Sequence, residues 1–160
     1  MHIKIRTMKK DEYPLLRKFF YHAIYVTDGC KMPDQSILKH PDLAKYFENF
    51  GADGEHALVA ENAGIILGVI WGRNFDSKNK GYGYYADGYI ELSMAVLLEY
   101  RKQGIGKELL SSFIKLEKSY NTKGLSLSVS KDNFAQHLYK EYGFQIVEER
   151  DSDLLMKLDL

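Results

Sequence analysis

The sequence contains few of the features that stabilise secreted proteins or anchor proteins in membranes. Cys30 is the only cysteine, so no disulfide can form within the chain. No apolar run approaches the roughly 18 residues needed to cross a bilayer. Charged residues interrupt the first six residues, where a signal peptide would have an apolar segment. These absences argue against a disulfide scaffold or a membrane anchor and predict a cytoplasmic protein.

An excess of one charge is also missing. Lys and Arg number 22, Asp and Glu number 22, and the formal net charge is zero. Without an overall positive field, the chain is not expected to bind nucleic acid. The neutral balance also argues against a specialist for polyamines or histone tails. Any recognition of charge is therefore expected to be local.

The 160 residues are enough for one domain, residues 1–160, whose core needs no disulfide or metal. In the first half, the apolar spacing predicts a strand at 3–5, a helix from Asp11, a short helix at 43–47, and a hairpin of strands 56–60 and 65–71 with a four-residue turn. The second half alternates strands and helices, an α/β pattern. Its expected elements are 89–97, 104–120, 125–129, 133–142, 144–149 and 154–158.

Residues 96–110, VLLEYRKQGIGKELL, place two glycines between a basic turn and an amphipathic helix. A P-loop would require Ser or Thr at Glu108, and a dinucleotide fingerprint would require a third glycine at Leu109, so neither motif applies. Glycines still allow a close approach of the backbone to a ligand, and the first N–H groups of a helix favour an anion. The stretch is therefore either a cradle for a phosphate or pyrophosphate, or simply a tight turn.

The residues before and after the two glycines form a longer pattern than a tight turn alone would require. Residues 101–106, RKQGIG, resemble the R/Q-x-x-G-x-G/A motif of the GNAT acetyltransferase superfamily, and residues 127–144, LSVSKDNFAQHLYKEYGF, resemble its second motif. The resemblance extends from about residue 89 to 160. It implies a GNAT-like α/β (α+β) fold, in which helices flank one mixed, mostly antiparallel sheet of six or seven strands. It also implies an N-acetyltransferase that moves the acetyl group of acetyl-CoA to a primary amine by direct attack in a ternary complex, without a metal.

The resemblance further implies where acetyl-CoA would bind. Its pyrophosphate would lie on the glycine turn, and its pantetheine arm would enter between two strands that splay apart. The implied residues are Ala95, Val96, Leu97, Arg101, Lys102, Gln103, Gly104, Ile105, Gly106, Lys107 and Asn133. From the residues alone, Asn133 is equally a helix N-cap. The alternating serines of 125–130 either line the cofactor or face solvent.

Two residues are candidates for catalysis. The resemblance implies that Tyr139 protonates the leaving thiolate, but its helical spacing also suits a core aromatic residue. Glu91 is the candidate general base. Counted back from the glycines, the family position falls at 90 or 92, so Glu91 would face the other side of its strand unless a bulge shifts it. A structural carboxylate, or a water chain with Ser93 or a tyrosine, is the alternative.

The acceptor is less defined. The family resemblance places Tyr82, Tyr84, Tyr85 and Asp87 near the acceptor pocket, where aromatic rings and a carboxylate would suit an ammonium. A small molecule, a protein N-terminus and a lysine all remain open, as does a monomer or a homodimer. The alternative from another functional class is a catalytically silent module that binds acyl-CoA as a sensor or scaffold.

Overall fold

In the computed structural model, which describes residues 1–160, all seven strands form one sheet in the order β1-β2-β3-β4-β5-β7-β6. Only the β4–β5 pair is parallel. The predicted mixed, mostly antiparallel sheet is therefore confirmed. Its strands are β1 (Lys4–Thr7), β2 (Ala57–Asn62), β3 (Ile65–Arg73), β4 (Tyr89–Val96), β5 (Gly124–Ser130), β6 (Gln145–Glu149) and β7 (Asp153–Asp159).

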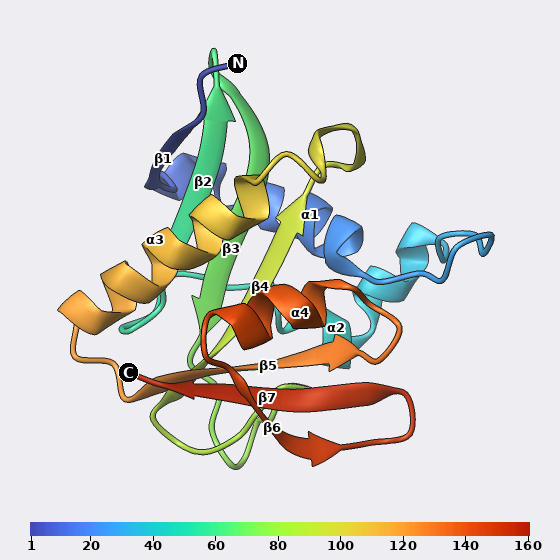
Figure 1. Cartoon of the computed structure of the whole chain (residues 1–160), viewed down its shortest axis with the longest axis vertical. Coiled ribbons are helices and arrows are strands. Elements are labelled where there is room, and N and C mark those ends of the chain that lie inside the picture. Colours follow the sequence, from blue (N-terminus) through green and yellow to red (C-terminus); the bar gives the residue numbers. More distant parts are fainter.

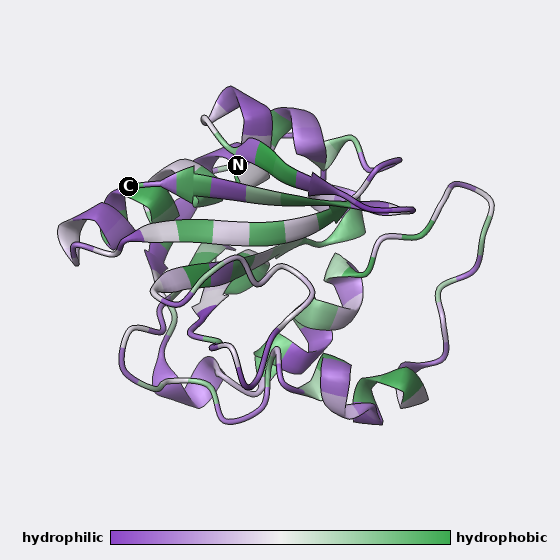
Figure 2. Ribbon diagram, turned by 90° about the horizontal axis from the view of Figure 1, so that it is seen from below, coloured by the Kyte–Doolittle hydropathy of each residue, from purple (hydrophilic) through white to green (hydrophobic).

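Helices cover both faces of the sheet (Figure 1). On one face, α3 (Ile105–Ser119) and α4 (Ala135–Glu141) lie over a core that includes Leu109 and Phe113. On the other face, α1 (Leu15–Ala23) and the short α2 (Pro41–Ala44) lie over a second core that includes Phe19 and Trp71. Along the strands, hydrophobic and hydrophilic residues alternate in many places (Figure 2), because successive side chains point to opposite faces.

Strands β4 and β5 separate soon after they meet. They pair over only three residues each, 89–91 of β4 with 124–126 of β5, although both strands continue beyond these pairs. The backbone of β4 from Leu92 to Val96 therefore has a partner on its β3 side and none on its β5 side. This opening in the middle of the sheet positions the site described below.

Three local predictions need correction. The hairpin turn has two residues, Ala63 and Gly64, both with positive φ (49° and 81°), which fits a type I′ turn and not the predicted four-residue turn. The helix expected from Asp11 begins as a single 3-10 turn and becomes α1 only after Pro14, whose ring blocks a continuous helix. The helix expected at 43–47 ends at Ala44, so Tyr46 lies in the turns that follow it.

The loop at residues 74–88 covers part of the sheet where no helix does. Gly83 touches the backbone of β5 so closely that a Cβ atom there would lie 2.6 Å from the carbonyl carbon of Leu127. The Nζ atom of Lys157 on β7 lies 5.2 Å from the centroid of the Tyr85 ring in this loop. Ser126 of β5 is fully buried. The sequence predicted that the alternating serines of 125–130 either line the cofactor or face solvent. Ser126 does neither, because it is buried and lines neither of the two cavities described below, whereas Ser128 and Ser130 line the smaller one.

Candidate active site

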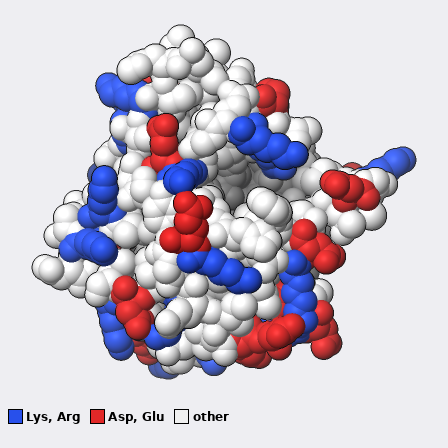
Figure 3. Space-filling model, in the orientation of Figure 1, with Lys and Arg blue, Asp and Glu red and all other residues white.

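A cleft of about 660 Å³ opens where β4 and β5 separate. Its walls are the end of β4, the glycine turn, the start of α4, and the end of α1 with the residues after it. Figure 3 shows a hollow on the face that carries α3 and α4, with basic side chains on its rim. Of the predicted cofactor-binding residues, it is lined by Ala95, Val96, Arg101, Lys102, Gly104, Ile105, Gly106, Lys107 and Asn133.

Two predicted cofactor residues do not line this cleft. The N–H group of Leu97 donates to the carbonyl oxygen of Leu67 on β3 at 2.9 Å. The side-chain amide of Gln103 donates to the carbonyl oxygen of Glu99 at 3.3 Å, which stabilises the turn itself. Because N–H groups alternate in direction along a strand, the Val96 N–H points toward the opening, while those of Leu97 and Ala95 point toward β3.

The glycine turn presents unused hydrogen-bond donors to the cleft. Gly104 has a φ of 85°, a conformation that side chains with a Cβ rarely adopt, and it precedes the first residue of α3. The backbone N–H groups of residues 104–107 donate to no acceptor in the protein, and no side chain caps the helix. Together with the helix dipole, these groups form a site suited to an anion such as a pyrophosphate.

Arg101 contributes to the turn through backbone contacts. Its Nε donates to the carbonyl oxygen of Val96 at 2.9 Å, and its Nη2 donates to the carbonyl oxygen of His22 at 3.0 Å. The side chain thereby ties the turn to the end of β4 and to α1. Lys102 and Lys107 also line the cleft, and Lys107 forms an exposed ion pair with Glu141 at 2.9 Å.

Asn133 both caps the start of α4 and lines the cleft. Its Oδ1 accepts a hydrogen bond from the Ala135 N–H at 2.9 Å, as a cap does. The same residue lines the cleft. Nearby, the Tyr25 hydroxyl donates to the carbonyl oxygen of Asp132 at 3.0 Å and so bridges the segment after α1 to the turn before α4.

A smaller cavity of about 330 Å³ adjoins the cleft. The two share Ala23, Ile24, Tyr25, Met94, Asn133 and Ala135 as lining residues. The smaller cavity also contains both predicted catalytic residues, Glu91 and Tyr139. The sequence separates these two residues by almost 50 positions, and the opening between β4 and β5 brings both to one cavity.

Glu91 lies on the face of β4 opposite to Ile90 and Leu92, which belong to the core under α3. The pairing of β4 with β3 has no register shift, so no bulge reorients the side chain. Glu91 is 3% exposed, and its Oε1 has no hydrogen-bond partner. Burial raises the pKa of Glu91 to about 7, although the hydrogen bond from Tyr46 opposes that rise.

Tyr46 is a site residue that the sequence did not indicate. Its hydroxyl donates to Oε2 of Glu91 at 2.5 Å and accepts from the backbone N–H of Tyr82 at 2.7 Å. Burial raises the pKa of Tyr46 far above its usual range, so the phenol stays protonated and continues to donate. No motif indicated this role, because the spacing around Tyr46 predicted only an apolar position in the short helix expected at 43–47.

Tyr139 is both a core aromatic residue and a lining residue of the smaller cavity. Its ring is 7% exposed and packs edge-on against Phe144, with centroids 5.6 Å apart. Burial raises the pKa of Tyr139 to about 12, so its hydroxyl is protonated at neutral pH. The arrangement is compatible with a proton donor at this position.

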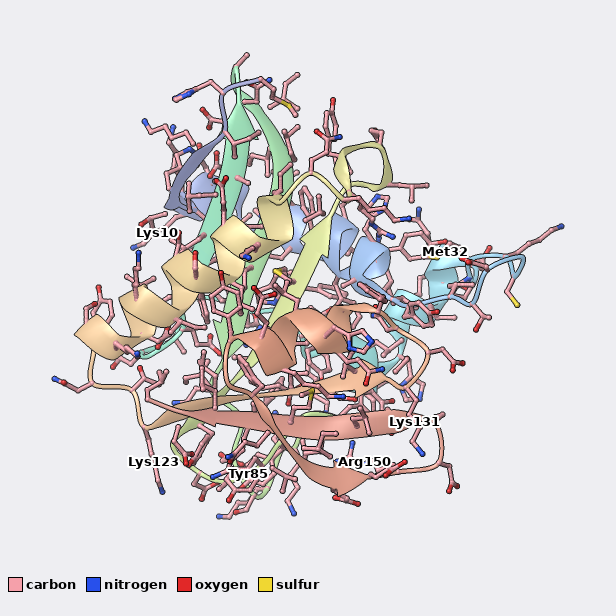
Figure 4. The ribbon with its side chains drawn as sticks, viewed as in Figure 1. Lys10, Met32, Tyr85, Lys123, Lys131 and Arg150 are labelled. Atoms are coloured by element: carbon pink, nitrogen blue, oxygen red, sulfur yellow. The ribbon has the colours of Figure 1, made fainter.

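The four predicted acceptor residues do not lie together. Tyr82 lines the smaller cavity, whereas Tyr84, Tyr85 and Asp87 line neither cavity. The Tyr84 hydroxyl donates to Asp87 at 2.6 Å, a contact within the loop. Tyr85 packs edge-on against Tyr89 with centroids 4.8 Å apart, and Figure 4 shows it below β7 at the lower edge of the molecule.

Comparison with known proteins identifies the family of this chain. A family model described as an acetyltransferase (GNAT) domain matches residues 53–146, more than half of the chain. The chain therefore belongs to the GNAT acetyltransferase family, as its two motifs predicted. A search of curated proteins gave no significant match. No helix combines the length and apolar character required to cross a membrane.

Solved structures share the fold along the whole chain. The YncA putative acetyltransferase from Salmonella typhimurium, solved with acetyl-CoA, is 22% identical with a TM-score of 0.71, covering 100% of this chain and 95% of that one. Ribosomal-protein-alanine N-acetyltransferase from Brucella melitensis is 23% identical with a TM-score of 0.68, covering 98% and 99%. PaiA N-acetyltransferase from Thermoplasma acidophilum, solved with coenzyme A, is 19% identical with a TM-score of 0.68, covering 100% of both chains.

Proposed function

We propose that this acetyltransferase transfers the acetyl group of acetyl-CoA to a primary amine by direct attack in a ternary complex. One observation carries the proposal: a long cleft with unused anion-binding donors joins a smaller cavity that contains a buried carboxylate without a full set of partners. The acetyl-CoA and coenzyme A bound to the Salmonella and Thermoplasma proteins support the choice of cosubstrate. We also propose that residues 1–160 form a single domain, because one sheet contains every strand.

The larger cleft is the proposed site for acetyl-CoA. The N–H groups of residues 104–107 would bind the pyrophosphate, with Lys102 and Lys107 adding positive charge. The pantetheine arm would run along the opening between β4 and β5, where Val96 offers a backbone N–H that β3 does not use. This arrangement directs the thioester toward the smaller cavity.

Glu91 is the proposed general base. An alkylammonium has a pKa of about 10, so only about one amine in a thousand is neutral at pH 7. With a pKa of about 7, Glu91 is partly ionised at neutral pH and accepts a proton from the amine, directly or through a water molecule. The neutral nitrogen then attacks the thioester carbon.

The remaining steps use Val96 and Tyr139. The Val96 N–H would stabilise the oxyanion that forms when the nitrogen–carbon bond is made. When the carbon–sulfur bond breaks, the Tyr139 hydroxyl would donate a proton to the leaving thiolate. After the attack, the nitrogen loses its remaining extra proton to solvent, and solvent returns a proton to Tyr139. The products are the N-acetylated amine and free coenzyme A.

The test combines binding and turnover. Coenzyme A at 100 times its Kd should raise the free energy of unfolding by about 2.7 kcal/mol and raise the melting temperature accordingly. ATP shares the phosphates but lacks the pantetheine arm, so it should stabilise the protein much less. Release of thiol from acetyl-CoA should then depend on an added amine. Equal stabilisation by ATP and coenzyme A would contradict the proposed cleft.

One observation favours a second candidate function. Glu91 does not share the strand face of positions 90 and 92, where the family resemblance places the carboxylate. A silent module that binds acyl-CoA as a sensor or scaffold would need no base. Such a module would be stabilised by acetyl-CoA yet release no thiol with any amine, whereas an enzyme shows both effects.

A further inference from the structure

The smaller cavity contains one charged side chain, and its charge is negative. Glu91 is the only Asp, Glu, Lys or Arg in its lining. The other polar side chains of the cavity are neutral hydroxyl and amide groups, such as those of Ser93, Ser128, Ser130 and Asn133. A negative charge in an otherwise neutral, largely apolar wall favours a ligand that carries a positive charge of its own. The cavity is thus suited to a single ammonium group.

The two nearest cations behind the cavity wall already have partners in the protein. Lys45 and Arg150 are the cations whose charge reaches Glu91. Lys45 Nζ donates to the carbonyl oxygen of Lys80 at 2.5 Å, and Arg150 binds both the carbonyl oxygen of Tyr82 at 2.6 Å and the Asp153 carboxylate at 3.0 Å. Asp153 also accepts from a serine hydroxyl of β5 at 2.6 Å. The wall of the smaller cavity therefore has no cation to pair with a carboxylate on the acceptor, and no anion besides Glu91 to pair with a second ammonium.

Aromatic rings form much of the remaining wall. Phe20 stacks on Tyr46 with centroids 5.1 Å apart, and Tyr46 is parallel to Tyr82 at 6.4 Å. All three rings, with Tyr25 and Tyr139, line the cavity. Rings of this kind bury an apolar body well and also favour a nearby ammonium. The cavity volume of about 330 Å³ lies at the lower end of the range for ligand sites, about 300–1,000 Å³.

We infer that the acceptor is a small monoamine with an aromatic or aliphatic body and no second charge. This inference rests on the proposed function and names the class of amine that the same site takes. The amine nitrogen lies on the Glu91 side of the cavity, and the body lies against the aromatic wall that Phe20, Tyr46 and Tyr82 form. A carboxylate or second ammonium on the same molecule would lose its water without gaining a partner.

The experiment compares matched amines with the purified full chain at saturating acetyl-CoA, measuring thiol release. 2-Phenylethylamine is the probe, phenylalanine adds a carboxylate to it, 1,4-diaminobutane carries a second ammonium, and a short peptide with a free N-terminus represents protein acceptors. The value of kcat/KM for 2-phenylethylamine should exceed each of the others by about tenfold or more, since a buried unpaired polar group costs about 1–3 kcal/mol. An equal or higher value for any of the other three overturns the inference.

Failure of this inference is distinguishable from failure of the proposed function. If coenzyme A stabilises the protein and another amine is the better substrate, only the inference is wrong. If coenzyme A stabilises the protein and no amine reacts, both the inference and the transfer reaction are wrong, and the silent module remains. If coenzyme A does not bind, the proposed function fails and the inference fails with it.

A pair of variants tests the charge argument without removing a core residue. Ser130 lines the smaller cavity at the end of β5, where it is partly exposed. Ser130→Asp adds a second carboxylate, and Ser130→Asn adds a side chain of the same shape without the charge. Relative to 2-phenylethylamine, kcat/KM for 1,4-diaminobutane should rise about tenfold in Ser130→Asp and stay within about twofold in Ser130→Asn. The same ratio in both variants would overturn the inference.

Discussion

Replacing Glu91 by glutamine keeps the size of the side chain and removes its charge. In the wild type, burial raises the pKa of Glu91 from 4.5 to about 7. The folded protein therefore holds this proton more tightly than the unfolded chain does. Its free energy of unfolding must fall as the pH rises from about 4.5 to about 7, and a pKa rise of this size corresponds to about 3 kcal/mol.

The glutamine side chain of the variant does not ionise, so the variant lacks this loss of stability. The free energy of unfolding of Glu91→Gln minus that of the wild type should therefore increase by up to about 3 kcal/mol between pH 4.5 and pH 8, as measured by urea denaturation at a series of pH values. Glu48→Gln, at an exposed position, controls for the removal of one carboxylate. A difference that stays constant across this pH range would show that burial does not disfavour the charged form of Glu91.

Activity measurements on the same variant test the role of the carboxylate. If Glu91 is the base, kcat/KM of the wild type falls as the pH drops below about 7, because Glu91 becomes protonated. Glu91→Gln should lose this acid limb and be slower by about 10²–10⁴-fold. A variant that keeps both the limb and the rate would assign the proton transfer to water or to another residue.

Three further changes test other parts of the molecule. Tyr139→Phe keeps the ring and removes the proposed donor, so kcat should fall about tenfold or more while the Kd for coenzyme A stays within about twofold; an unchanged kcat would remove Tyr139 from the mechanism. At Gly106 a Cβ would lie 3.6 Å from a Met94 methyl group, which is an ordinary contact, so Gly106→Val should still fold. This variant should lose most of the thermal stabilisation by coenzyme A, because the added side chain lies at the anion-binding start of α3. The control variant Lys118→Ala, near the other end of α3, should keep that stabilisation. His56 binds the fully buried carboxylate of Glu117 at 2.7 Å, so His56→Ala should lower the free energy of unfolding by about 2–4 kcal/mol in urea denaturation; a loss below about 0.5 kcal/mol would show that the carboxylate does not need this partner.

The cofactor side of the site could be predicted from the sequence, because it is built from residues that are consecutive in the chain. The glycine turn, the end of β4 and the start of α4 each fall within a short motif, and most of the residues predicted to bind the cofactor line the cleft. Gln103 and Leu97 are the exceptions. Their contacts depend on the neighbouring turn and on β3, which a local motif does not encode.

The acceptor side was harder to predict from the sequence, because its residues lie far apart in the chain and come together only in the folded protein. Tyr46 and Glu91 are 45 positions apart, and their contact depends on how the segment after α2 folds back on β4. The spacing around Tyr46 suggested an apolar position within a helix, but α2 ends at Ala44, two residues before Tyr46. Tyr84 and Tyr85 were chosen for their place in a tyrosine-rich loop, but side-chain direction within an irregular loop has no period from which to predict it.

The loop at 74–88 contributes to the smaller cavity, where the acceptor is proposed to bind, but not to the cleft proposed for acetyl-CoA. Acetyl-CoA would be held by regular structure and backbone groups, whereas this loop supplies Tyr82 to the smaller cavity and rests on β5 through Gly83. A chimaera that exchanges this loop for that of a relative would change the acceptor wall and leave the glycine turn and α3 intact. The graft has one requirement: because no Cβ fits against the Leu127 backbone, the incoming loop must also place a glycine at position 83.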